Sequence, residues 1–273
     1  MQTRFNISYT VLNLKNHKSL KIFCIQHGSV FESYGGVEYY LDDLLTIAAE
    51  LYGGANVCSI VPRRTEHFSK EERLYDYVIR NFSRNPIVGK LQNRFSLTFF
   101  LQALSQIRRF GPDLLLVSHV SLGPLTYLLH LCTKIPYVSV VYGIECWGNL
   151  WPQDEWCLRK ASGIISISHW TKNILVKRGY SDEKIRIIHP ALNEHFAKFH
   201  APAQLVREHT PLRLLSISRL DPNEQYKGHD HVIEALRILR TERPEVSVQY
   251  TIRGEGGDRP RLERMVRDYV LDR

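Results

Sequence analysis

The sequence has few of the features that mark several broad protein classes. Among its 273 residues there are five cysteines and no C-x-x-C pair. No apolar run approaches the ~18 residues that a membrane-spanning helix needs, and residues 1–20 hold no apolar core followed by a small-residue cleavage site. We therefore expect no membrane span, no secretion signal, no disulfide framework and no zinc site, and we expect reduced thiols in a cytoplasmic protein.

One stretch has no acidic residues. Between Tyr77 and Pro112 the chain contains no Asp or Glu, whereas five Arg, including Arg108 and Arg109, lie there together with Lys90 and several Phe. A basic flank beside an apolar helix face can rest on an anionic membrane. The alternative is a helix that packs into the core and carries a solvated basic end.

The composition is that of an ordinary globular protein. Hydrophobic residues make up 44% of the chain and charged residues 23%, which argues against intrinsic disorder and against fibrous or low-complexity proteins. The net charge of +8 is modest, and no RRM, helix-turn-helix or zinc-finger pattern accompanies it. We expect no nucleic-acid partner.

The first part of the chain alternates short apolar runs with segments of helical period. Strands are predicted at residues 20–26, 56–61, 113–117, 137–141, 163–167 and 185–188, and helices at residues 36–52, 69–81, 91–110, 124–132 and 170–178. Continuous apolar strands separated by helices indicate a parallel sheet covered on both faces. Residues 1–196 are therefore predicted to form one doubly wound α/β domain, preceded by a tail at residues 1–19.

A polar stretch at residues 197–210 has no apolar period and is predicted to be a linker. Alternation then restarts, with strands predicted at residues 212–218 and 246–252 and helices at residues 228–240 and 260–271. Residues 211–273 thus hold the first βαβα part of a second, Rossmann-like domain. Two strands leave open edges and bury little apolar area, so we expect this second domain to be partial.

Two glycine-containing turns follow predicted strands. Gly35 and Gly36 open the helix at residues 36–52, where free N–H groups attract phosphate or a sugar hydroxyl. Gly254 and Gly256 follow the last predicted strand in the same way. Neither Gly35-Gly36 nor Gly53-Gly54 supplies the G-x-G-x-x-G dinucleotide fingerprint, which argues against a nicotinamide-dependent oxidoreductase.

Arg219 and Lys227 flank the turn after the strand at residues 212–218. Two fixed cations at a helix N-terminus suit a diphosphate, whose charge grows as it leaves. Surface Arg and Lys are common, however, and the pair alone does not define a site.

Six short motifs, in this order, resemble those of glycosyltransferase family 4, whose members are retaining and metal-independent enzymes of the GT-B fold. The matching segments are G-G-V-E at residues 35–38, Y-G-I-E at 142–145, I-S-I-S at 165–168, H-P-A-L-N at 189–193 followed by Phe196, S-R-L at 218–220 with K-G at 227–228, and G-E-G at 254–256. The resemblance begins at Lys21 and continues to the last residue.

The resemblance implies a hexosyltransferase that moves a sugar from a nucleoside-diphosphate sugar to a glycan or lipid-linked acceptor with retention. Arg219 and Lys227 would then neutralise the donor diphosphate, and Tyr142 stands where the family usually has a His that contacts the sugar. The implied donor-binding residues are Gly35, Gly36, Gly254 and Gly256. No metal or other cofactor is implied, and the N-terminal domain would hold the acceptor.

The chain also departs from the family pattern. The family's E-x7-E segment, whose acidic residues bind the donor sugar and ribose, would lie beyond Arg273. One hypothesis is therefore an active transferase of cell-envelope polysaccharide synthesis, cytoplasmic and peripheral at the inner face of the membrane. The alternative is a truncated, catalytically incompetent remnant that acts at most as a binding module.

The remaining candidates belong to the acceptor side. His119 follows the strand at residues 113–117, at a sheet edge where ligands bind. Glu145 and Trp147 lie close together in the sequence, and tryptophan rings stack on sugar rings. Packing of Trp147 against the following helix is the alternative. Asp42 and Asp43 lie inside a helical pattern and form no D-x-D motif, so no metal site is predicted.

Overall fold

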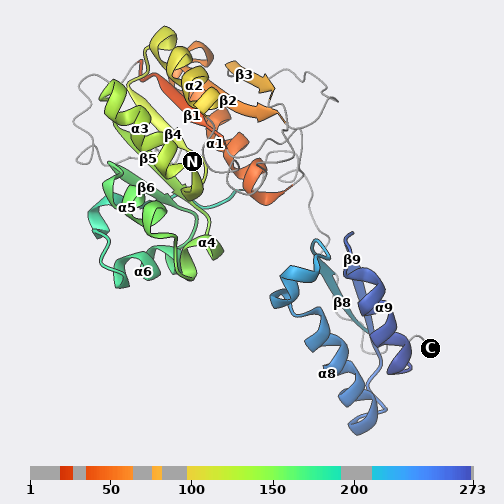
Figure 1. Ribbon diagram of the computed structural model, residues 1–273. Coiled ribbons are helices and arrows are strands. Elements are labelled where there is room, and N and C mark those ends of the chain that lie inside the picture. The colour runs from red at the N-terminus through yellow and green to blue at the C-terminus, as the bar shows by residue number, and fades with distance from the viewer. Residues whose placement is uncertain (1–18, 27–34, 64–75, 82–96, 192–210, 272–273) are drawn as a thin grey trace, which may run out of the picture. The chain divides into compact units, whose positions relative to one another are not determined.

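The computed structural model describes residues 19–26, 35–63, 76–81, 97–191 and 211–271. Its internal contacts divide the chain into two compact units, Met1–Phe199 and His200–Arg273 (Figure 1). The linker expected at residues 197–210 and nearly all of the tail expected at residues 1–19 lie outside the described ranges.

The first unit is built on a parallel sheet of seven strands. They are β1 (Ile22–Ile25), β2 (Val57–Arg63), β3 (Asp76–Asn81), β4 (Leu114–Val117), β5 (Tyr137–Val141), β6 (Gly163–Ser166) and β7 (Ile185–Ile187). Their order across the sheet is β3-β2-β1-β4-β5-β6-β7, and every neighbouring pair is parallel. The predicted α/β class and all six predicted strands are confirmed.

The strand β3 corrects one prediction. Residues 69–81 are predicted as a helix, but residues 76–81 form a strand that pairs in parallel with β2, with Tyr77 opposite Ser59 and Val78 opposite Ile60. The run Tyr77, Val78 and Ile79 consists of aromatic and β-branched residues, which favour a strand. The helical spacing of its apolar residues was therefore misleading, because so short a run fits either period.

The helices of this unit are α1 (Gly36–Tyr52), α2 (Leu97–Phe110), α3 (Gly123–Thr133), α4 (Ile144–Trp147), α5 (Pro152–Lys160) and α6 (His169–Lys177). The predicted α1 has the bounds observed, and α3 and α6 agree with prediction to within a residue at each end. Prediction missed α4 and α5. The signals for α5 were nevertheless present: Pro152 in its first turn, acidic residues beside it, and Arg159 and Lys160 in its last turn.

Alternate residues of the central strands face different helices. Ile22 and Cys24 of β1 lie in a core with α1, whereas Phe23 and Ile25 lie in a core with α2 and α3. All four are buried. Because a strand buried on both faces needs helices on both sides, the uninterrupted apolar sequence of β1 and the layered arrangement in Figure 1 have the same cause.

Helix α2 belongs to the acid-free stretch. Phe99, Ala103 and Ile107 are buried in the core, while Leu97 and Leu101 are exposed. Residues 82–96 of the stretch lie outside the described ranges. None of the described helices combines the length and apolarity that a membrane crossing requires.

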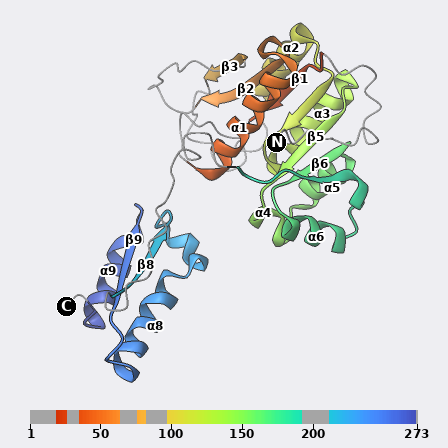
Figure 2. The same cartoon turned by 180° about the vertical axis from the view of Figure 1, so that it is seen from behind.

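The second unit contains β8 (Leu212–Ile217), α8 (His229–Glu242), β9 (Val248–Arg253) and α9 (Arg259–Asp268), close to the four predicted elements. The two strands lie side by side in Figure 2 and pair in parallel. Leu220, Ile233 and Leu262 form a small core with the helices. Arg261 of α9 joins the helices, since it pairs with Asp230 of α8 at 2.9 Å and with Asp258 at 2.7 Å. These ion pairs hold the pKa of both carboxyls below the usual range.

We expect Leu45→Ala in α1 to lower the free energy of unfolding by about 2–4 kcal/mol, because Leu45 is fully buried and its loss leaves a cavity. The matched control is Leu51→Ala on the same helix, where the side chain is 66% exposed and the change should stay within about 0.5 kcal/mol. Urea unfolding followed by tryptophan fluorescence measures both, and equal losses would contradict the packing described.

Candidate functional site

Helix α1 begins at the carboxyl edge of the sheet of the first unit. Gly35 is its N-cap residue and has extended backbone, and it carries no side chain that could cap the helix. The carboxylate of Glu38, in the first turn, lies over Gly35, because a Cβ placed on Gly35 would stand 2.3 Å from Glu38 Oε2. Gly36 is exposed, and a Cβ placed on it would meet nothing within 4 Å. The structure leaves open space beside Gly36, whereas the Glu38 carboxylate occupies the space beside Gly35. The donor-binding role of the two glycines stays a prediction. Residues 27–34, which precede this turn, lie outside the described ranges.

Tyr142 and Glu145 come together directly after β5. One carboxylate oxygen of Glu145 accepts a hydrogen bond from the backbone N–H of Tyr142 at 2.5 Å, and the other accepts from the N–H of Gly143 at 3.0 Å. Both are N–H groups at the start of α4, where a carboxylate is favourable. Glu145 is thus engaged in shaping the turn that carries Tyr142.

The hydroxyl of Tyr142 is buried and has no hydrogen-bond partner within the described part of the chain. The ring packs edge-to-face against Tyr40, with 5.8 Å between centroids. Burial raises the pKa of Tyr142 well above its usual range, and neighbouring groups including Glu145 raise it further. The phenol therefore stays protonated at neutral pH and is no base there.

The other acceptor-side candidates occupy separate turns at this edge. His119 caps a short 3-10 helix, with its Nδ1 2.8 Å from the hydroxyl of Ser121. Trp147 is half exposed, and its Nε1 donates to Thr171 at 3.2 Å. Its ring therefore combines packing against α6 with an open face.

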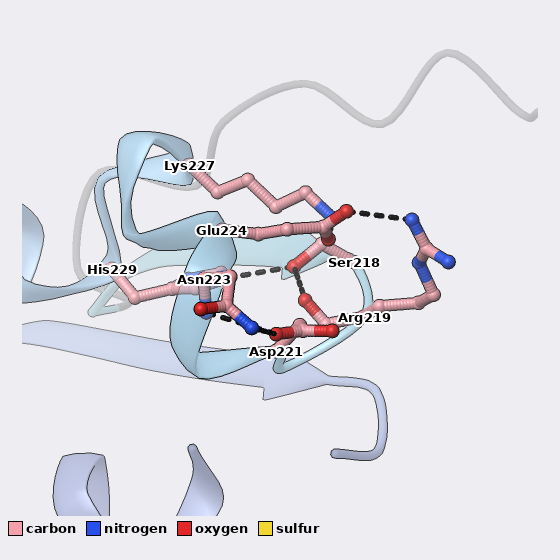
Figure 3. Close-up of polar contacts among 7 residues, drawn as sticks. All are labelled: Ser218, Arg219, Asp221, Asn223, Glu224, Lys227 and His229. Atoms are coloured by element: carbon pink, nitrogen blue, oxygen red, sulfur yellow. Dashed lines mark hydrogen bonds and ion pairs between the residues drawn. The ribbon is translucent and has the colours of Figure 1, made fainter. Parts of the chain in front are cut away.

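The two predicted cations of the second unit converge on one carboxylate (Figure 3). The Nη2 atom of Arg219 lies 2.6 Å from Oε1 of Glu224, and the Nζ atom of Lys227 lies 2.5 Å from Oε2 of the same residue. Glu224 sits in the 3-10 segment Pro222–Lys227, which connects the turn after β8 to α8. The turn thus brings two positive charges onto a single oxyanion.

A hydrogen-bonded chain supports this turn from beneath. Tyr250 Oη donates to Ser216 Oγ at 2.9 Å and lies 3.2 Å from the Nδ1 atom of His229. The other ring nitrogen of His229, Nε2, lies 2.7 Å from Ser218 Oγ. His229 is buried at the first position of α8, and it fixes the residue that directly precedes Arg219.

Gly254 and Gly256 allow the turn after β9 to lie against the turn after β8. A Cβ on Gly254 would stand 1.7 Å from the backbone oxygen of Ser218, and one on Gly256 would stand 2.0 Å from that of Leu220. Both have positive φ, 154° and 149°. The N–H of Leu220 donates to the carbonyl of Glu255 at 2.8 Å. These glycines therefore support the cation-bearing turn by close backbone approach.

A hollow of about 800 Å³ lies between β9 and α9, beside this turn. Its lining includes Leu220, Ile252, Gly254, Arg259 and Leu262. The volume falls in the range of small-molecule sites. Among the described residues, no group of three or more His, Cys, Asp or Glu side chains is arranged to hold a metal ion.

The sequence interpretation missed Glu224 and His229. Glu224 precedes Lys227 by three residues, a spacing at which ion pairs form on helical turns. Its contact with Lys227 could therefore have been predicted from the sequence. Its second contact, with Arg219, depends on the local backbone, because Glu224 has the non-helical angles φ −111° and ψ 30°.

The class of the fold follows from solved structures. The chain is similar to the lipopolysaccharide outer core galactosyltransferase WaaB (14% identity, TM-score 0.66), covering 93% of this chain and 66% of that one. It is similar to HepE of Anabaena in complex with UDP (14% identity, TM-score 0.63), covering 93% of this chain and 67% of that one. It is also similar to sucrose-phosphate synthase of Thermosynechococcus elongatus (16% identity, TM-score 0.62), covering 93% of this chain and 68% of that one. The fold is of the GT-B type, and the chain spans about two thirds of the length of these structures.

The family follows from the sequence. The model of glycosyltransferase family 4 matches residues 34–196, more than half of the chain, and the chain belongs to this family. No curated protein sequence matches it.

We expect Gly254→Ala to destabilise the second unit by more than about 2 kcal/mol, because the new methyl collides with a backbone oxygen and φ is positive. Gly257→Ala is the matched control, since its Cβ would come no closer than 3.7 Å to Pro222. Amide hydrogen exchange of β8 and β9 reports the effect. Unchanged exchange in Gly254→Ala would show that the two turns are not in contact.

Proposed function

We propose that this chain binds a nucleoside-diphosphate sugar and transfers the sugar to a glycan or lipid-linked acceptor with retention of configuration. One observation carries the proposal: Arg219 and Lys227 meet on one oxyanion, at the carboxyl end of β8 and the start of α8. Ligands of open parallel sheets bind at this edge. The membership in glycosyltransferase family 4 selects this ligand among other phosphates.

The chemical role of the two cations follows from how charge moves during transfer. As the bond between the sugar and the diphosphate breaks, negative charge accumulates on the leaving diphosphate. Cations fixed in place before the reaction stabilise that charge more in the transition state than in the bound donor, and this difference accelerates the reaction. The hollow beside the turn, with Gly254 in its wall, offers room for the nucleoside.

The proposed donor is supported by what the structural neighbours bind. HepE of Anabaena is described in complexes with UDP, with UDP and glucose, and with UDP-glucose. Gly35 and Gly36 would present N–H groups to the sugar or its phosphates. No metal takes part in the proposed reaction, because Arg219 and Lys227 supply the positive charge.

The proposed acceptor side lies in the first unit. His119, Glu145 and Trp147 lie on turns at the carboxyl edge of its sheet, and the open face of Trp147 suits stacking on a sugar ring. We place the reaction in cell-envelope polysaccharide synthesis, in the cytoplasm and peripheral to the anionic inner face of the membrane. The basic end of α2, with Arg108 and Arg109, supports that contact.

The donor assignment predicts a loss of ligand binding in Arg219→Gln with Lys227→Gln. In the unaltered chain, nucleoside diphosphates and their sugars should raise the thermal midpoint, since they bind the native state. In the double variant the affinity should fall at least about tenfold, which is ~1.4 kcal/mol. Arg243→Gln is the control, because Arg243 pairs only with Glu245 among its charged neighbours in the described chain, on the exposed surface. Equal shifts in all three proteins would refute the assignment.

Tyr142→Phe should separate activity from stability. Removing a buried hydroxyl that has no partner in the described chain should leave the free energy of unfolding unchanged or raise it by about 1 kcal/mol. Sugar transfer should fall about tenfold or more if the phenol donates to a sugar oxygen. A thermal melt and a transfer assay with the responsive donor measure the two effects. Full activity with unchanged stability would remove Tyr142 from the catalytic candidates.

A further inference from the structure

We propose that Glu224 is a built-in counter-ion that holds the place of one phosphate group, and that the diphosphate of the donor displaces it. This inference rests on the proposed function, because it concerns the same two cations. Donor binding is then an exchange of anions: the ligand takes over Arg219 and Lys227, and the Glu224 side chain turns away.

The contacts of Glu224 resemble those that a phosphate group would make. The two oxygens of one carboxylate satisfy two cations at once, Oε1 with Arg219 at 2.6 Å and Oε2 with Lys227 at 2.5 Å. A phosphate group likewise presents two oxygens to neighbouring donors, and Arg and Lys bind carboxylates and phosphates through similar charge-assisted hydrogen bonds. The position that Glu224 occupies is therefore one that a phosphate group can fill.

The backbone of Glu224 is held independently of its carboxylate. Its backbone N–H donates to the carbonyl of Asp221 at 2.9 Å, and Asp221 also caps the segment through the N–H of Asn223. These bonds fix the backbone of the turn without using the Glu224 carboxylate (Figure 3). The side chain can therefore leave by rotating about its own bonds, while Arg219 and Lys227 stay in place.

The charge of the incoming anion decides whether it displaces Glu224. An incoming ion with one negative charge replaces the carboxylate by an equal charge, so the electrostatic free energy of the two cations changes little. A diphosphate brings more than one negative charge to the same two cations, so the exchange favours it. Glu224 thereby makes the site selective for multiply charged oxyanions, and it keeps the cations paired when none is bound.

The test compares Glu224→Gln with the unaltered chain, using inorganic pyrophosphate as the probe and NMR titration as the readout. Glutamine keeps the size of the side chain and removes its charge, so pyrophosphate affinity should rise about tenfold. Glu234→Gln is the matched control, because Glu234 forms a comparable pair with Arg237 on the exposed side of α8 and its loss should leave the affinity unchanged. Adding Arg219→Gln to Glu224→Gln should abolish the gain.

The outcomes separate this inference from the proposed function. If Glu224→Gln binds pyrophosphate no better than the unaltered chain, Glu224 is no competing counter-ion and the inference fails. The proposed function is tested separately, by the thermal shifts with nucleotide sugars. Weaker binding in Glu224→Gln also overturns it and makes Glu224 a residue that orders the two cations. The inference fails as well if no protein in the series binds pyrophosphate.

A second measurement needs no variant. In a crystal structure of the unaltered chain with pyrophosphate, Arg219 and Lys227 should contact the probe and the Glu224 carboxylate should contact neither. If both ion pairs of Glu224 persist with pyrophosphate bound, the exchange does not occur.

Discussion

Parallel pairing of short, fully buried strands is the constraint on which the rest of the first unit depends. A strand such as β1, buried on both faces, requires helices on both sides of the sheet. Because the strands are parallel, the chain leaves each of them at the same edge of the sheet, and the following helix begins there. The turns that begin α1, α3 and α4 therefore collect at the carboxyl ends of the strands. Gly36, His119 and Tyr142 lie on these turns as a result of the topology.

Electrostatic pairing plays the corresponding part in the second unit. Its hydrophobic core is small, with Leu220, Ile233 and Leu262 as its buried members, and Arg261 links its helices through two carboxylates. The functional turn uses the same kind of contact for another purpose, because Glu224 keeps Arg219 and Lys227 together. One set of ion pairs thus supports the fold, and the other holds two cations together in the turn after β8.

The sequence allows the strands to be predicted better than the contacts of the site. The apolar run of β1 is recognisable as a strand because such runs alternate with segments of helical period along the first unit, whereas the short run in β3 fits either a strand or a helix until its pairing with β2 is seen. Arg219 and Lys227 are recognisable because their types and positions suit an anion. For their partner Glu224, the spacing from Lys227 predicts one ion pair, whereas the contact with Arg219 depends on backbone angles that no periodicity encodes. The glycines 254 and 256 are recognisable as turn residues, but the atoms that approach them belong to a turn about 35 residues earlier in the chain.

The close contact between the two glycine positions and the turn after β8 has a wider consequence. Arg219, Glu224 and Lys227 are near neighbours in the sequence, so their mutual contacts form locally and at little cost in chain entropy. Their location on the unit, by contrast, depends on backbone contacts with the turn after β9, which is distant in the sequence. Sequence changes in that distant segment can therefore alter ligand affinity without touching any ligand-binding group, and surveys of such proteins that compare only the charged residues will overlook them.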